Sequence, residues 1–211
     1  FVVHPDDRGG QRTDADLLGA RFPYRAELWP APMPDHGIFV EPLAKPLVFI
    51  AEVKLDECEL NGPWTNAVDE NIHRVLRAIG VVGEPEIGTM AQSLYKGHRF
   101  DGRDVDVRLI AVGDRVNATY ARRRPALVQI TWEEILRFIH CRFRCYRQQK
   151  ANHPQWDDVG QTLWTLATQH RVEGFVDSVR LRLSTPGSKL RLRPRSVQEP
   201  DTAQQSGPPH G

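Results

Sequence analysis

The segment from Leu47 to Lys54 limits the possible folds more than any other part of this 211-residue chain. It reads Leu-Val-Phe-Ile-Ala-Glu-Val-Lys, so five successive apolar residues are followed by charge near the end of the run. A continuous apolar run of this length is typical of a strand that is buried on both faces. We therefore predict a central strand in a covered sheet, with its charged end at an opening.

The sequence around this strand mixes helix and strand patterns. Apolar residues from Ile72 to Ile79 recur at the spacing of one helix face. Thr131 and Glu134 form a capping-box pattern at the start of a long apolar-faced segment. We predict strands over residues 1–4, 14–22 and 104–112, and helices over 65–82, 87–95, from 131 onward and around 156–166. This order predicts an α/β fold with a mixed central sheet flanked by helices.

The C-terminal part has a different composition. Residues 179–183 and 190–193 alternate Arg with Val or Leu around a Pro-Gly turn, which predicts a basic β-hairpin over 176–195. Large apolar residues almost vanish after it, which predicts a disordered tail over 196–211. The main domain would then span 1–175. Because the chain starts with Phe1 in an apolar run, we expect an element that is truncated at its N-terminus.

Charge and composition narrow the class of protein. The formal net charge is +1, but the last 32 residues carry six basic and two acidic residues, so the tail is basic and the body slightly acidic. No apolar run is long enough for a membrane span, and no signal peptide is evident, so we expect a cytoplasmic protein with no membrane partner. Walker, dinucleotide-binding, hydrolase-elbow and zincin motifs are absent from the sequence.

Four charged residues form the pattern that carries chemistry. Asp14 and Asp16 are two positions apart in the predicted second strand, and Glu52 and Lys54 are two apart at the end of the central strand. Residues two apart in a strand share a face, so pairing of the two strands would bring these side chains together. Carboxylates that converge in this way can hold Mg²⁺, and a fixed lysine can stabilise charge that develops during phosphodiester hydrolysis.

These residues resemble the PD-(D/E)XK nucleases, the restriction-endonuclease-like superfamily. Within Thr13–Gly19, Asp16 matches the metal-binding Asp of the family, and within Phe49–Lys54, Glu52 and Lys54 match its E-x-K motif. The resemblance implies a restriction-endonuclease-like fold and hydrolysis of DNA with Mg²⁺ or Mn²⁺. It implies that Asp16, Glu52 and the backbone carbonyl of Val53 bind the metal, and that Lys54 assists the attacking water. Asp14 is a possible additional ligand, although a solvated charge is the simpler interpretation.

Two alternatives stay open at this stage. An E-x-K triplet arises by chance about once in a chain of this size, yet Lys54 is the only one of five lysines with an acidic residue two positions earlier. The first alternative is a catalytically silent nucleic-acid-binding or scaffold module with the same fold. The second is an unrelated α/β interaction protein in which Glu52 and Lys54 face solvent separately. The simplest interpretation of the motif itself is an ordinary surface pair of solvated charges. In a nuclease, we expect Asp16 to be accessible only through a cleft that contains Lys54.

Arginines are the candidate contacts to nucleic acid, because arginine binds phosphate in a planar fork. The candidates are Arg74, Arg77, Arg122, Arg123, Arg124, Arg180, Arg182, Arg191 and Arg193. We place the 122–124 triplet in a loop and the last four on one face of the basic hairpin. The alternative is that these charges belong to solvated faces or protect a strand edge from aggregation.

Overall fold

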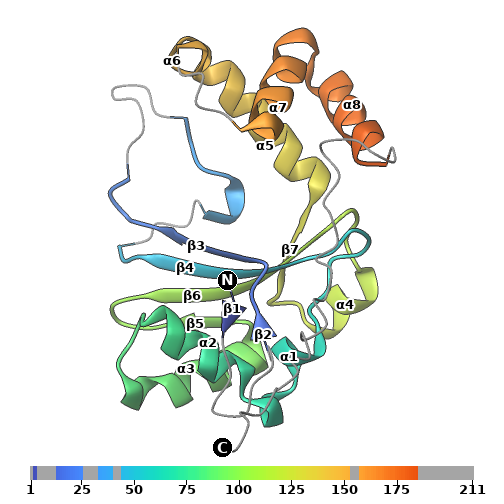
Figure 1. The fold of residues 1–211 in the computed structure, drawn as a ribbon. Coiled ribbons are helices and arrows are strands. Elements are labelled where there is room, and N and C mark those ends of the chain that lie inside the picture. The colour runs from blue at the N-terminus through green and yellow to red at the C-terminus, as the bar shows by residue number, and fades with distance from the viewer. Residues whose placement is uncertain (1, 4–12, 26–32, 40–43, 153–156, 185–211) are drawn as a thin grey trace, which may run out of the picture. The chain divides into compact units, whose positions relative to one another are not determined.

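The computed structural model describes residues 2–3, 13–25, 33–39, 44–152 and 157–184 (Figure 1). The chain divides into two compact units, residues 1–152 and 153–211. All strands within the described ranges belong to the first unit. The described part of the second unit consists of two helices, α7 (Asp158–Gln169) and α8 (Val172–Ser184).

A mixed five-stranded sheet forms the centre of the first unit. Its strands are β3 (Leu17–Arg21), β4 (Leu47–Val53), β5 (Arg99–Asp101), β6 (Asp106–Gly113) and β7 (Val128–Thr131). β4 pairs antiparallel with β3 from Leu47 to Ala51. It pairs parallel with β6 along its whole length. On the other edge of β6, β5 pairs antiparallel with the first half and β7 pairs parallel with the second half. A separate antiparallel pair joins β1 (Val2–Val3) to β2 (Thr13–Asp14).

The prediction of a central strand covered on both faces is confirmed. Val48 and Ile50 belong to a core that includes residues of the helices on one side of the sheet. Ala51 belongs to a second core, against which Trp132 and the short helix η1 (Gly37–Phe39) pack. Figure 1 shows α1 to α4 on one side of the sheet and α5 leaving it on the other. The α/β class with a mixed sheet flanked by helices is likewise confirmed.

The helices of this unit follow local signals closely. They are α1 (Gly62–Thr65), η2 (Ala67–Asp69), α2 (Asn71–Ile79), α3 (Glu84–Gly97), α4 (Ala118–Arg123), α5 (Trp132–Cys145) and α6 (Arg147–Ala151). The predicted helix over 65–82 is divided, because Glu70 has a left-handed backbone (φ 52°) between η2 and α2. α2 ends at Gly80, whose φ of 69° is the left-handed conformation favoured by glycine. The predicted capping box of Thr131 and Glu134 opens α5.

The C-terminal hairpin needs correction. Residues 179–183, predicted as its first strand, lie in helix α8, and the predicted domain boundary at residue 175 falls inside this helix. The apolar residues Phe175, Val176 and Val179 are all buried and have helical spacing. Strict alternation has the period of a strand, but the upstream apolar residues favour the helix, which leaves Leu181 70% exposed on the side opposite Val179. The second predicted strand, 190–193, and the tail 196–211 lie outside the described residues.

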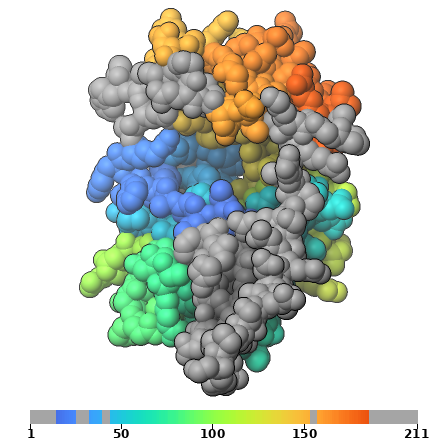
Figure 2. Space-filling view, in the orientation of Figure 1, coloured from blue at the N-terminus to red at the C-terminus, as the bar shows by residue number. Residues whose placement is uncertain are grey.

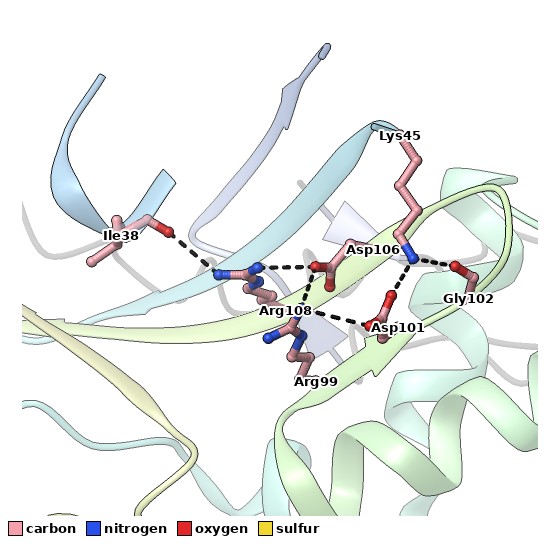
Figure 3. Close-up of polar contacts among 7 residues, drawn as sticks. All are labelled: Ile38, Lys45, Arg99, Asp101, Gly102, Asp106 and Arg108. Carbon is pink, nitrogen blue, oxygen red and sulfur yellow. Dashed lines mark hydrogen bonds and ion pairs between the residues drawn. The ribbon is translucent and has the colours of Figure 1, made fainter. Parts of the chain in front are cut away.

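A charged cluster around the buried residues Asp106 and Arg108 joins the N-terminal end of β6 to its neighbours. Figure 3 draws its members, Ile38, Lys45, Arg99, Asp101, Gly102, Asp106 and Arg108. Asp106 is fully buried, and its Oδ2 accepts hydrogen bonds from Nη2 of Arg108 at 2.9 Å and of Arg99 at 3.1 Å. Arg108 also donates to the carbonyl oxygen of Ile38 at 3.3 Å. Lys45 forms an ion pair with Asp101, so the cluster ties η1, β5 and the residues before β4 to β6.

Candidate functional site

Pairing of β3 with β4 places Asp16 beside the end of the central strand. Asp16 directly precedes β3, and the register pairs Leu17 with Ala51, so the register continued by one position would set Asp16 opposite Glu52. Asp16 Oδ2 accepts a hydrogen bond from the backbone N–H of Val53 at 2.8 Å. The side chain therefore replaces a backbone acceptor at the point where the ladder ends. Figure 2 shows in blue the described residues near the N-terminus, which include β3.

Glu52 is a buried carboxylate, with 4% of the residue exposed. Its Oε1 accepts from Lys54 Nζ at 2.6 Å and from the amide of Asn61. Its Oε2 accepts from the indole N–H of Trp64 at 2.8 Å. Burial raises the pKa of Glu52, the bonds from Lys54 and Trp64 oppose this effect, and the nearby charge of Asp16 adds to it. Glu52 thus has the perturbed environment common among functional carboxyl groups.

Lys54 is fixed at both its backbone and its side chain. Its backbone N–H donates to Val112 O at 2.8 Å, and its carbonyl oxygen accepts from the Trp132 indole at 3.1 Å. Its ammonium group lies between Glu52 Oε1 and Asn61 Oδ1, at 2.6 and 2.5 Å. The side chain is 24% exposed, so the ammonium group is partly shielded from water. Such a fixed cation can stabilise negative charge without reorganising.

Two carboxylates, those of Asp16 and Glu52, lie at the end of β4, and the charge of Asp16 acts on the pKa of Glu52. The structure describes no group of three His, Cys, Asp or Glu side chains able to hold a metal. Mg²⁺, however, is commonly bound through one or two carboxylates together with substrate phosphate. Among the described residues, Trp64 is the donor to Glu52 Oε2, and a carboxylate oxygen has two acceptor positions. The Val53 N–H points toward Asp16, and its carbonyl faces the same edge because both groups of a strand residue point one way.

Two expectations about the aspartates need correction. Asp14 and Asp16 do not lie on one continuous strand, because Asp14 ends β2 and Asp16 forms a bend before β3. Asp14 pairs through its backbone with Val2 of β1, and its side chain is outside the described part of the chain. Asp16 is exposed rather than enclosed in a cleft, since the bend lifts it out of the ladder at the sheet edge. Access to Asp16 therefore does not depend on passing Lys54.

The loop after Lys54 is held close to the end of β6. Backbone N–H groups of Asp114 and Arg115 donate to Asp56 O at 2.5 and 3.2 Å, and Cys58 N–H donates to Arg115 O at 2.9 Å. Gly113 makes this approach possible, because a Cβ there would lie 2.6 Å from the backbone nitrogen of Cys58. The loop that returns the chain toward Glu52 is therefore fixed by the sheet itself.

The two arginines of α2 are occupied by neighbouring groups. Arg77 binds Glu84 through Nε and Nη2, at 2.9 and 2.5 Å. Arg74 donates to the carbonyl oxygen of Asp69 at 2.5 Å. Both side chains would have to exchange these partners for phosphate, so the structure gives them local roles and leaves their predicted contact with nucleic acid a prediction.

Arg122 and Arg123 form the end of helix α4 and Arg124 directly follows it, whereas a loop was predicted. Asn117 caps α4, because its side chain accepts a hydrogen bond from Tyr120 N–H at 2.8 Å. An Asn at this position is a helix-start signal that the sequence analysis did not use. Arg122 and Arg123 lie exposed in the last turn, and Arg124 Nη1 is 3.2 Å from His98 Nε2. Arg180 and Arg182 lie on α8 of the other unit, and residues 191 and 193 are outside the described ranges.

Asn61 and Trp64 were missed as site residues by the sequence reading. Both belong to the Asn-Gly-Pro-Trp segment that starts α1, which sequence reasoning treats only as a turn. Their position alone could have suggested a role, since polar and aromatic residues in the turn after an E-x-K strand can fold back onto its charged end. No pattern in the sequence indicates that return without knowledge of the contacts with β6.

Comparison with known proteins does not assign the chain to a class. No family model, no curated protein and no solved structure matches it. Across the described residues, no helix combines the length and apolar character needed to cross a membrane.

Proposed function

We propose that the protein is a metal-dependent nuclease that hydrolyses phosphodiester bonds in DNA, with a restriction-endonuclease-like fold. The observation that carries the proposal is the buried Glu52 carboxylate, 2.6 Å from the Lys54 ammonium at the end of the central strand. Asp16 lies on the adjacent edge of the sheet, bound to the backbone between these two residues. This is the arrangement that the resemblance to the PD-(D/E)XK nucleases implies.

Each residue has a distinct task in the proposed reaction. Asp16, Glu52 and the Val53 carbonyl would hold Mg²⁺ or Mn²⁺, which when bound supplies Lewis acidity and lowers the pKa of water. Lys54 is placed to orient the attacking water and to stabilise charge on the phosphate. Its fixed backbone supports this task, because catalytic groups must stay within a fraction of an ångström of their productive position.

An ordinary surface ion pair explains the geometry less well. Exposed pairs contribute about 0–1 kcal/mol and need no further support. Glu52 instead is buried and has three side-chain donors, one of them a Trp that is 2% exposed. Burying a carboxylate costs free energy, and a chemical role for Glu52 accounts for that cost.

The first prediction is loss of cleavage in site variants. Purified protein should cleave plasmid or oligonucleotide DNA with Mg²⁺ or Mn²⁺ and be inactive in EDTA. Asp16→Asn, Glu52→Gln and Lys54→Ala should each lower kcat by at least about 100-fold, because they remove groups that act in the transition state. The measurement is a gel-based rate with circular dichroism as the check on folding.

Matched variants separate the site from the general loss of charge. Glu59→Gln and Lys96→Ala make the same changes at exposed positions and should cleave at the wild-type rate. Cleavage by Glu52→Gln at the wild-type rate would assign the activity to another site or a contaminant. If wild-type protein cleaves neither single-stranded nor duplex DNA but binds it, the silent nucleic-acid-binding module becomes the better interpretation.

A further inference from the structure

Asn61 occupies a helix N-cap without capping the helix. It directly precedes α1, and its carbonyl oxygen accepts from Trp64 N–H at 3.0 Å, but its side chain makes no capping hydrogen bond. Asparagine is favoured at this position because its side chain normally binds the first free N–H groups. Asn66 and Asn117 do this at η2 and α4. The side chain of Asn61 is therefore directed to another task.

The side chain of Asn61 instead forms hydrogen bonds with Glu52 and Lys54. Its amide nitrogen donates to Glu52 Oε1, and its amide oxygen accepts from Lys54 Nζ at 2.5 Å. A carboxylate could only accept and an ammonium could only donate, whereas an amide has both a donor nitrogen and an acceptor oxygen and satisfies both partners at once. Trp64, one turn further, donates its indole N–H to the other oxygen of Glu52 at 2.8 Å.

We propose that Asn61 and Trp64 are positioning residues, which fix the orientation of the Glu52 carboxylate and its spacing from the Lys54 amine. The inference rests on the proposed nuclease function and extends it to residues that touch neither substrate nor metal. Trp64 locks the plane of the carboxylate from the buried side, and Asn61 sets the amine against the other oxygen. Groups that orient a ligand from behind typically change metal affinity or activity by about 10–100-fold when they are removed.

The first test measures the arrangement without any reaction. In ¹⁵N-labelled protein at low temperature, an ammonium group held by two acceptors exchanges its protons slowly and gives a signal, whereas solvated lysines exchange quickly. Lys54→Arg assigns that signal among the five lysines. We expect Asn61→Leu to broaden or shift it and Asn66→Leu, the same change at a nearby capping Asn, to leave it unchanged. An unaltered Lys54 signal in Asn61→Leu would overturn the proposal.

The second test measures the consequences for metal and rate. By calorimetry, the Kd for Mn²⁺ should rise about 10–100-fold in Asn61→Leu and Trp64→Phe and stay within about twofold in Asn66→Leu. In cleavage assays, Asn61→Leu should lower kcat by a similar factor with KM for DNA within about threefold, since DNA binding does not use this amide. Unchanged or tighter Mn²⁺ binding in Asn61→Leu would contradict a positioning role. If Trp64→Phe does not fold, the exposed Asn61 still decides the question.

The outcomes for the two proposals can be told apart. Wild-type protein that binds Mn²⁺ but cleaves no DNA would end the nuclease proposal, while the Mn²⁺ affinities and the Lys54 signal would still test the role of Asn61. If wild-type protein binds Mn²⁺ too weakly to measure without DNA, cleavage still tests the nuclease proposal, and the Lys54 signal alone decides whether Asn61 fixes the amine. Cleavage by the wild type together with an unaffected Asn61→Leu would overturn only the positioning role.

Discussion

At the scale of single residues, His98 is the most unusual titratable group outside the candidate site. It follows α3 with a left-handed backbone (φ 57°) and is 2% exposed. Burial, and then the charge of Arg124, lower the pKa of His98 to about 4. Its Nε2 lies 3.2 Å from Arg124 Nη1, an arrangement that suits a neutral imidazole as acceptor. His98 therefore stabilises the fold only while it is uncharged.

This gives a prediction for acid stability. Between pH 6.5 and about 4, the unfolded chain takes up a proton at His98 that the folded chain does not, so the free energy of unfolding falls as pH decreases, by up to about 3 kcal/mol. His98→Asn should reduce this loss, because Asn tolerates the left-handed backbone and does not titrate. Urea unfolding of the wild type and of His98→Asn at pH 7 and pH 5 measures this loss of stability. Equal pH dependence in both proteins would show that His98 is not the source.

At the scale of elements, an ion pair helps to hold the short strand β5 against β6. It is three residues long, and Arg99 donates from it to the fully buried Asp106 of β6. Asp106→Asn would leave Arg108 and Arg99 beside a neutral amide, and breaking a buried ion pair costs about 3–5 kcal/mol. Asp101→Asn changes an ion pair whose carboxylate is 59% exposed, so it should destabilise the protein far less than Asp106→Asn does. Chemical denaturation of both variants provides the comparison, and similar losses would contradict the buried-pair argument.

Elements with a complete local pattern could be predicted from the sequence, and elements that depend on a partner could not. β4 and α5 have an apolar run and a capping box of their own, and both were predicted correctly. β5 and β7 were missed because three or four residues hold too few alternations to be recognised, and they exist through pairing with β6. Helix α8 was mistaken for a strand because residues 179–183 alternate strictly, although the apolar residues upstream have helical spacing.

The same distinction applies to the candidate site. Glu52 and Lys54 could be predicted because they end a strand whose continuous apolar run indicates burial. Their side chains are hydrogen-bonded to each other. Asp16 could be placed near them by strand order, but its exposure comes from a bend that no local pattern indicates. Asn61 and Trp64 act only because a loop fixed to β6 returns to Glu52, which is information about tertiary structure.

At the scale of the whole molecule, charge is distributed unevenly along the chain. The last 32 residues have an excess of four positive charges, and the rest has a small negative excess. If the protein binds duplex DNA, we predict that changing Arg180, Arg182, Arg191 and Arg193 to Gln lowers the slope of log affinity against log salt by about 0.9 for each phosphate that these arginines neutralise. Fluorescence anisotropy at several salt concentrations measures the slope. An unchanged slope would direct attention to Arg122 and Arg123 on α4.

The parallel pairing of β4 with β6 also sets when the candidate site can form during folding. Parallel strands cannot be joined by a tight turn, so α2 and α3 must be accommodated in the crossover before the two strands meet. Contacts between residues distant in sequence form slowly, because the entropy of loop closure must be overcome first. Lys54 is anchored to Val112 of β6. A newly synthesised chain therefore gains the fixed amine only after β6 has been made and paired, late in its folding.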